Sequence, residues 1–215
     1  MDINEHVPSL THLASFAKAR SRSRATHVAR DREQVTAPRE NRFFGFAYEK
    51  FITATIAYVT DGCRGPALRR AVEGASDRMR PSYEAAAAGI TKALGAIQPA
   101  TASRRQHSVV VVDPRDQLEL VSLRVHLRLT MTDGACSYAF LYFPGARLAE
   151  VEEAVIETAV GLSVRQVDPT ASALIINVRQ GKVRTIDFET ALSEQRLDFL
   201  RRESVSYRAE WVAAA

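Results

Sequence analysis

The spacing of hydrophobic residues changes about halfway along the chain. Between residues 41 and 97, apolar residues recur at intervals of three and four, as they do in helices that bury one face. After residue 107 they come in short runs of valine, leucine, isoleucine and aromatic residues bounded by turns, as they do in strands. The pattern predicts a helical N-terminal half followed by a sheet.

The second half predicts a definite order of elements. Strands are expected in "HSVVVVD", "LELVSLRVHLRLTM", "CSYAFLYF" and "SALIINVRQGKVRTID". The "TDGA" turn should pair residues 121–130 with 136–143 in an antiparallel hairpin. Between the third and fourth strands, "RLAEVEEAVIETAVGL" has one apolar and one glutamate-rich face, which indicates a crossover helix between parallel strands.

These elements together predict an α+β fold: a helical N-terminal half, a small mixed sheet and a long C-terminal helix. The sheet consists of a three-strand meander, the crossover helix and a fourth strand. The C-terminal helix carries an apolar stripe with spacings of three and four, which is expected to form a homodimer or dock on a protein partner if the chain is an interaction subunit. The candidate interaction residues are Leu197, Leu200, Tyr207 and Trp211.

Basic residues are concentrated near the N-terminus. Residues 15–44 carry a net charge of +5 within a chain whose total is +4, and "THLASFAKARSRSRATHVARDREQVTAPRE" loses its apolar period after a short helix. We therefore expect a basic arm with a short helix over residues 1–40 and a single α+β domain over 41–215. The arm is either a solvated surface segment or a contact for phosphates or a partner. The candidate nucleic-acid-binding residues are Arg20, Arg22, Arg24, Arg30 and Arg32 in the arm, with Arg124 and Arg128 on the hairpin.

Composition narrows the possible classes of protein. With 46% hydrophobic residues among 215, the chain can bury a substantial core. No apolar run is long enough to cross a bilayer and the N-terminus does not have the pattern of a signal peptide, so a cytoplasmic location is expected. Cys63 and Cys136 are expected to be reduced, and no zinc-ligand spacing, phosphate-binding loop or serine-nucleophile motif occurs. No metal or other cofactor is expected.

The order of helix, three strands, crossover helix and fourth strand resembles the PD-(D/E)XK nuclease superfamily, in particular its RecB-like exonuclease branch, over about residues 41–190. "FGFAYEKFI" places Gly45 and Glu49 like the G-x-x-x-E helix of that branch. In "RVHLRLTMTDG" the position of the metal-binding aspartate holds His126, and "YAFLYFP" has Leu141 and Phe143 where an acid and a lysine belong. Such nucleases need clustered carboxylates to hold divalent ions. The resemblance therefore implies a degenerate, non-cleaving core, and generic α+β geometry without shared origin is the alternative.

Three functions follow from these observations. The first is a non-enzymatic, nucleic-acid-associated or complex-forming protein with a nuclease-like core. The second is a divergent nuclease using Mg²⁺ or Mn²⁺, with acids drawn from unexpected places; the third is a structural or protein-interaction subunit. Asp113 and Asp116 in "VDPRDQLEL" could bind a cation, although a proline-containing turn explains them more simply. The catalytic candidates are Glu49, Asp113, His126 and Asp133.

Overall fold

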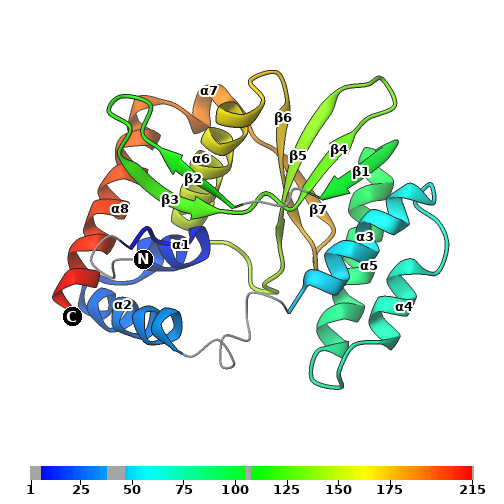
Figure 1. Cartoon of the computed structure of the whole chain (residues 1–215), viewed down its shortest axis with the longest axis horizontal. Coiled ribbons are helices and arrows are strands. Elements are labelled where there is room, and N and C mark those ends of the chain that lie inside the picture. Colours follow the sequence, from blue (N-terminus) through cyan, green and yellow to red (C-terminus); the bar gives the residue numbers. More distant parts are fainter. Residues whose placement is uncertain (1–5, 38–46, 105–107, 215) are drawn as a thin grey trace.

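The expected α+β class is confirmed by a computed structural model that describes residues 6–37, 47–104 and 108–214 (Figure 1). Helices precede, interrupt and follow a mixed sheet. The helices are α1 (Leu10–Lys18), α2 (Ser21–Thr36), α3 (Glu49–Thr60), α4 (Ala67–Glu73), α5 (Arg80–Ile97), α6 (Glu150–Val167), α7 (Phe188–Ala191) and α8 (Glu194–Ala213). The strands are β1 (Thr101–Arg104), β2 (Val109–Val112), β3 (Glu119–Leu123), β4 (Leu127–Thr130), β5 (Cys136–Tyr142), β6 (Ser172–Asn177) and β7 (Lys182–Thr185).

The main sheet has the strand order β1-β4-β5-β6-β7. Strands β5 and β6 are parallel and are connected by α6, as the crossover pattern predicted, and the other neighbours are antiparallel. The stretch expected as one fourth strand forms the β6–β7 hairpin. The "NVRQGKV" segment, which the sequence indicates as a hairpin or a strand kink, is the hairpin, so the sheet has two strands after the crossover.

The central strands are covered on both faces. Tyr138 and Phe140 of β5 belong to one hydrophobic core, which includes residues of α1, α6 and α8. Ala139 and Leu141 point the other way, into a second core with α3 and α5. Figure 1 shows the two groups of helices on opposite sides of the sheet. This double burial explains why β5 and β6 read as nearly continuous apolar runs.

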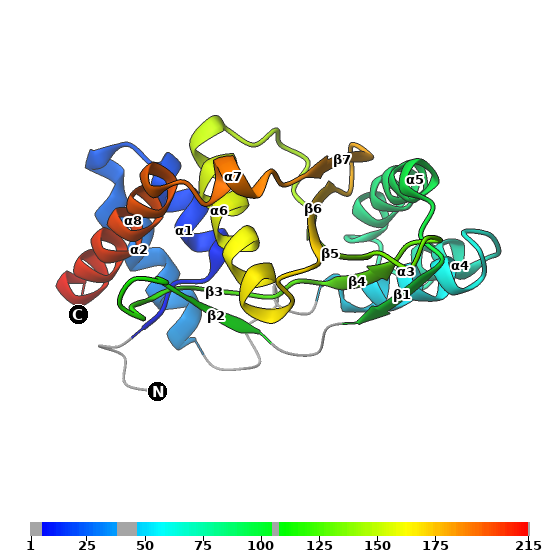
Figure 2. The ribbon, with the colours of Figure 1, turned by 90° about the horizontal axis from the view of Figure 1, so that it is seen from above.

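A long, bent β-ribbon joins the two cores. Strand β1 pairs with β4 and β2 pairs with β3 in nearly the same register. Strands β3 and β4 follow each other along one segment of the chain, and the strand is broken between them at residues 124–126. Figure 2 shows β1 and β4 beside α3 while β2 and β3 extend beneath α6. The ribbon corrects one expectation and adds one strand. Residues 121–123 pair with β2 rather than with β5, and the polar segment before residue 105 contributes the edge strand β1.

The remainder of the expected hairpin is confirmed. Residues 127–130 pair with 136–139 in antiparallel register. The turn between them contains Gly134, whose φ of +85° is readily adopted only by glycine. The sequence therefore identified this turn and the strands next to it, but not the partner change at residues 124–126.

The N-terminal region forms two helices rather than an arm with one short helix. Helix α1 packs on α6, and α2 packs on α8. Phe16 and Val28 are fully buried in the core that these helices share with α8. The basic segment is thus part of the packed structure as far as residue 37.

Helix α5 approaches the β6–β7 turn at one glycine. A Cβ at Gly89 would overlap the backbone carbonyl oxygen of Val178. Gly181, in the same turn, has a φ of +64°, and a Cβ there would lie 2.9 Å from the carbonyl oxygen of Gly89. The two backbones can meet this closely only because both positions lack side chains.

Candidate functional site

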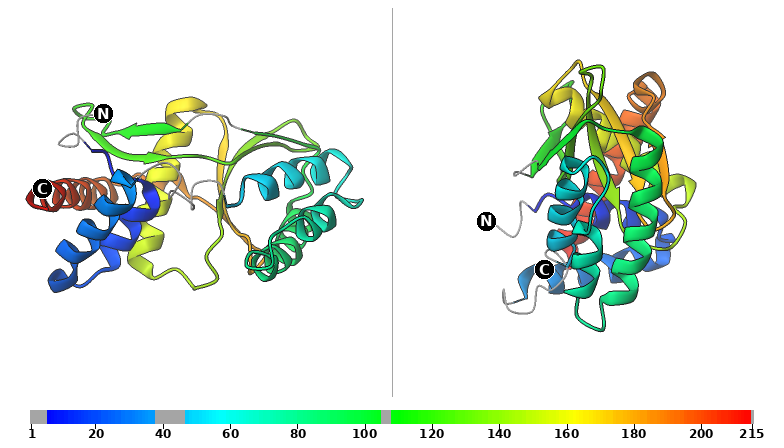
Figure 3. Two further views of the ribbon diagram at one scale, coloured as in Figure 1. Left: turned by 60° about the horizontal axis from the view of Figure 1, so that its bottom comes forward. Right: turned by 90° about the vertical axis from the view of Figure 1, so that its right-hand side faces the viewer.

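A cleft of about 670 Å³ opens where the ribbon bends. Its walls come from residues 9–12 of the α1 region, Gln34 of α2, residues 48–52 of α3, residues 122–126 of the ribbon and residues 140–144 at the end of β5. The left view of Figure 3 shows α1 and α2 (blue) below the β2–β3 end of the bent ribbon and α3 (cyan) below its β1–β4 end. The interruption at residues 124–126 turns Arg124 and His126 toward this space, since both line the cleft.

One carboxylate in the cleft holds two arginines. Glu49 is the first residue of α3, where the helix dipole favours an acid. Its Oε1 accepts a hydrogen bond of 2.6 Å from Nη1 of Arg124, and its Oε2 forms an ion pair with Arg104. The Glu49 side chain is 23% exposed. Two guanidinium groups facing one carboxylate leave a local charge of +1 beside the cleft.

His126 is neutral at physiological pH. Its Nδ1 accepts the backbone N–H of Leu141 at 2.9 Å, so that the ring proton is on Nε2. Burial, together with repulsion from Arg124 and Arg104, lowers the pKa of His126 to about 4. The imidazole can therefore offer a hydrogen-bond donor to a ligand without adding charge.

Aromatic rings form a fixed surface next to these groups. Tyr48 stacks on Phe143 with ring centroids 3.9 Å apart and an angle of 12° between the planes. The Tyr48 hydroxyl accepts a hydrogen bond from Arg179 at 2.9 Å, which anchors its outer end. The Phe143 ring in turn meets His126 edge to face at 6.1 Å. The rings hold one another in place and give this wall of the cleft an aromatic surface.

All the described positions to which the nuclease resemblance assigned a role lie in this cleft. Glu49, His126, Leu141 and Phe143 line it together, whereas Gly45 lies outside the described residues. The positions that should carry an acid and a lysine are apolar and buried, with Leu141 2% and Phe143 8% exposed. Within the described part of the chain, no group of three or more histidine, cysteine or acidic side chains is arranged to hold a metal ion.

The other two catalytic candidates lie elsewhere. Asp113 is almost completely buried and accepts hydrogen bonds from Arg115 at 2.9 Å and Arg201 at 2.8 Å. These bonds hold the pKa of the Asp113 carboxyl well below its usual range. Asp133 accepts the backbone N–H of Ala135 at 2.9 Å in the exposed hairpin turn. Neither lines the cleft, so the acids of the divergent-nuclease hypothesis do not converge there.

The arginines of the N-terminal region have different environments. Arg24 donates a hydrogen bond of 2.8 Å to the buried Glu203, and Arg32 bonds the backbone oxygen of Trp211 at 3.3 Å. Arg20, Arg22 and Arg30 are exposed on or beside α2. Among these basic residues, the exposed ones are the better candidates for contacting a ligand.

The sequence missed Arg104 and overestimated the C-terminal stripe. Arg104 lies in β1, a short polar strand that no hydrophobic pattern indicated, and no local pattern connects it with Glu49. On α8, the four candidate interaction residues are all buried against the chain's own helices. Their exposed fractions are 9% for Leu197, 0% for Leu200 and Tyr207 and 2% for Trp211.

Comparison with known proteins adds no assignment to these geometric findings. No protein-family model matches the chain, and no curated protein matches its sequence. None of the helices in the described ranges is long and apolar enough to span a bilayer.

Proposed function

We propose that the chain is a non-enzymatic nucleic-acid-binding protein with a degenerate PD-(D/E)XK-like core, and that the cleft at the ribbon bend holds single-stranded nucleic acid. The observation that carries this proposal is that one cleft contains a stacked aromatic pair and a glutamate shared by two arginines, Arg124 in its wall and Arg104 beside it. Proteins that bind single strands combine basic grooves with aromatic faces on which bases stack.

The electrostatics favour an anionic ligand. Arg104 and Arg124 are both partly exposed, with 33% and 39% of their side chains accessible. Arg30 lies one helical turn before Gln34, which lines the cleft, so it extends the basic surface along the same face of α2. A phosphate entering the cleft can take over part of the hydrogen bonding that the arginines now give to Glu49.

The order of elements supports the nuclease-like part of the proposal. Helices α3 to α5 are followed by β1, β4 and β5, by the crossover α6 and by β6, which is parallel to β5. The resemblance rests on a helix, three strands, a crossover helix and a fourth strand; here the first of the three strands is β1 rather than the segment 109–112, which pairs with β3. Shared architecture alone does not determine function, so the argument for binding rests on the cleft.

The chemistry of the cleft argues against cleavage. Nucleases of this class use carboxylates to place metal ions at the attacking and leaving oxygens. Here the single glutamate is held by two arginines, and Leu141 and Phe143 provide neither a metal ligand nor a proton-transfer group. The same positions instead form an apolar floor beneath a base.

The test is fluorescence anisotropy with labelled single-stranded oligonucleotides at a series of salt concentrations. The parent should bind at low salt, and a double variant, Arg104→Gln with Arg124→Gln, should bind more weakly. The salt slope should flatten by about 1.4, because each phosphate contact on a single strand contributes about 0.7. As a matched control, Arg64→Gln with Arg78→Gln removes two exposed arginines outside the cleft and should leave most of the affinity intact.

Two outcomes would overturn the proposal. Parent protein that does not bind nucleic acid at low salt would leave the interaction-subunit hypothesis in first place. Cleavage with Mg²⁺ or Mn²⁺ that disappears in EDTA and in the Glu49→Gln variant would establish the divergent nuclease instead.

A further inference from the structure

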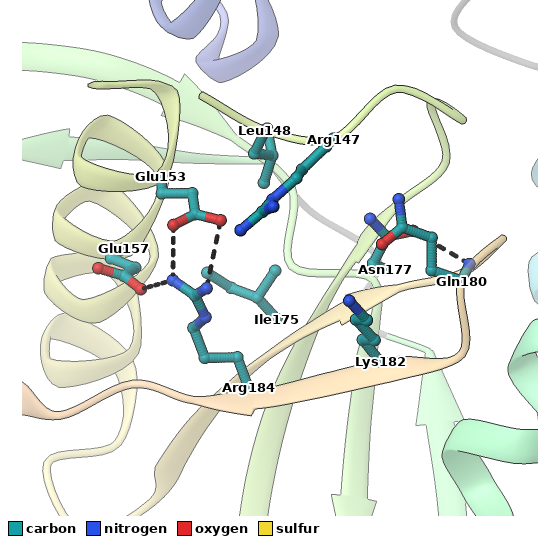
Figure 4. Close-up of a pocket in the computed structure, with 9 residues that line it drawn as sticks. All are labelled: Arg147, Leu148, Glu153, Glu157, Ile175, Asn177, Gln180, Lys182 and Arg184. Carbon is teal, nitrogen blue, oxygen red and sulfur yellow. Dashed lines mark hydrogen bonds and ion pairs between the residues drawn. The ribbon is translucent and has the colours of Figure 1, made fainter. Parts of the chain in front are cut away.

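A second, smaller cavity of about 100 Å³ lies between the first turns of α6 and the β6–β7 hairpin, next to the carboxyl end of the parallel strand β6 (Figure 4). Its walls come from the loop before α6, the first turns of α6, the end of β6 and the strand β7. It shares none of its lining residues with the cleft. In sheets with parallel strands, ligands commonly bind at this end of the strands.

The acidic side of the cavity is already neutralised. Arg184 reaches both carboxylate oxygens of Glu153, at 2.9 and 3.2 Å, and one oxygen of Glu157 at 2.8 Å. Arg196 approaches the other oxygen of Glu157 at 4.0 Å. Two acids and two arginines therefore form a charge-balanced group along one wall.

The opposite side of the cavity carries two further cations. Within the described part of the chain, Arg147 and Lys182 make neither an ion pair nor a side-chain hydrogen bond. Figure 4 shows their charged ends directed into the space over Ile175, from the loop and from β7. The cavity thus has a positive charge of about two that the protein does not balance locally.

A side-chain amide adds directional donors. The Oδ1 atom of Asn177 accepts the backbone N–H of Gln180 at 3.2 Å, which fixes the amide and leaves its N–H₂ group available. Asn177 is the last residue of β6 and lines the cavity with Arg147 and Lys182. Two cations and an oriented amide around a small space match the acceptors of a phosphate group.

We propose that this cavity binds a phosphate group, either as the free ion or as the end of a phosphorylated ligand. Arg147 and Lys182 balance its charge, and Asn177 donates to a further oxygen. The proposal is independent of the cleft, because it concerns different side chains and is tested with inorganic phosphate.

The experiment is a calorimetric titration of the full chain with inorganic phosphate at constant ionic strength. The parent should show saturable binding. Arg147→Gln combined with Lys182→Gln should weaken binding by at least about tenfold, because it removes two charge-assisted contacts. Lys50→Gln with Arg78→Gln removes equal charge outside the cavity and should leave the affinity nearly unchanged.

A variant that gains affinity sharpens the test. Glu153→Gln removes one of the two carboxylates that occupy Arg184, and phosphate should bind it several-fold more tightly than it binds the parent. Absence of saturable binding by the parent overturns the proposal. Equal affinity in the parent and the Arg147/Lys182 double variant also overturns it.

Two further measurements identify the source of the phosphate and separate the two sites. A 5′-phosphorylated oligonucleotide that outcompetes its 5′-hydroxyl form, with the difference lost in the Arg147/Lys182 variant, assigns the cavity to a terminal phosphate. Equal competition, together with retained binding of inorganic phosphate, assigns it to the free ion. In the Arg104/Arg124 cleft variant, phosphate binding should persist, so failure of the cleft proposal would leave this result unchanged.

Discussion

Asp113 and Glu49 each hold a pair of arginines, yet of these two clusters only the one around Glu49 opens onto the cleft. Asp113, in the turn between β2 and β3, is 1% exposed, whereas the Glu49 side chain at the start of α3 is 23% exposed. Both acids accept short, charge-assisted hydrogen bonds. The same chemical motif therefore occurs in a closed and an open setting.

The difference lies in the charge that remains. Around Asp113, the arginines also pair with Asp116 and Asp198, so that three acids face two cations. Around Glu49, one acid faces two arginines. The closed cluster needs no further ligand and fastens the β2–β3 turn to α8, whereas the open cluster has positive charge left over to attract one. An arginine–carboxylate cluster indicates a site for an anion only when its neighbours leave positive charge over.

The strongest test of the closed cluster is Asp113→Asn. This change should lower the free energy of unfolding by roughly 3 kcal/mol, because it removes the buried charge on which two arginines depend. For a chain of this length, the melting temperature should fall by about 6 to 12 °C. Calorimetric unfolding measures the effect, with Asp77→Asn as the control because Asp77 forms only an exposed ion pair with Arg80. Equal losses in the two variants would remove the distinction between closed and exposed clusters.

The free energy of unfolding should decrease in acid because of His126, which lies next to the arginines of the open cluster. Its pKa of about 4 in the folded chain lies below the ordinary value of 6.5, so the unfolded state binds protons more readily. Stability is therefore present above pH 6.5 and is lost as the pH falls toward 4, by about 2 kcal/mol at pH 5. His6, whose pKa burial also lowers to about 4, changes stability in the same direction.

Denaturant unfolding at pH 8 and pH 5 measures this loss. In a His126→Asn variant, the difference between the two pH values should shrink, because Asn can accept the N–H of Leu141 but does not titrate. An unchanged difference would show that His126 is not the group responsible.

Arg24 provides an intermediate case between the two clusters. It bonds Glu203, whose side chain is 5% exposed, and its guanidinium lies 4.6 Å from the centre of the Phe16 ring. Arg24→Ala should cost roughly 1.5 kcal/mol, because Glu203 would keep only a 3.8 Å contact with Arg202. Thermal unfolding of this variant, compared with that of the exposed control Arg22→Ala, measures the cost. If neither variant loses stability, Arg24 behaves like the solvated arginines.

Glu49→Gln should have the smallest effect on stability and the most informative effect on binding. Because Glu49 is partly exposed, we expect a loss below about 1 kcal/mol. Its two arginines would no longer face a carboxylate, so affinity for a single-stranded oligonucleotide should rise several-fold at low salt, which anisotropy measures. Weaker binding of the oligonucleotide in this variant would contradict the idea that Glu49 competes with a phosphate for the two arginines.

Much of the fold could be predicted because the spacing of apolar residues matches the elements that form, and because strands buried on both faces have nearly continuous apolar runs. The crossover helix α6 and strands β5 and β6 follow directly from their apolar patterns. The break at Arg124–His126 could not be predicted, because the alternation of apolar and polar residues continues across it while the pairing partner changes. Helix α2 was hidden by its arginine and serine repeats, since only a narrow face with Val28 and Asp31 is buried.

The candidate site was only partly within reach of the sequence. Glu49 and His126 could be identified because the resemblance assigned them positions. Arg104 and the stacked Tyr48 could not, because their relation to Glu49 and Phe143 depends on strand pairing and helix packing between distant segments. Asp113 is the opposite case: it was a candidate for chemistry that a proline-containing turn explained more simply, and in the turn between β2 and β3 its carboxylate is occupied by arginines.

The contact at Gly89 has a consequence for evolutionary descent. Even alanine at this position would drive a methyl group into the backbone of the β6–β7 turn, and no rotamer change can relieve a clash at Cβ. Surface arginines and cleft residues can diverge as ligands change, but a descendant that keeps α5 against this turn must keep a glycine here. A glycine in the middle of a helix, eight residues before the helix ends and followed about ninety residues later by a glycine turn, is therefore a marker by which distant relatives can be recognised after their binding residues have changed.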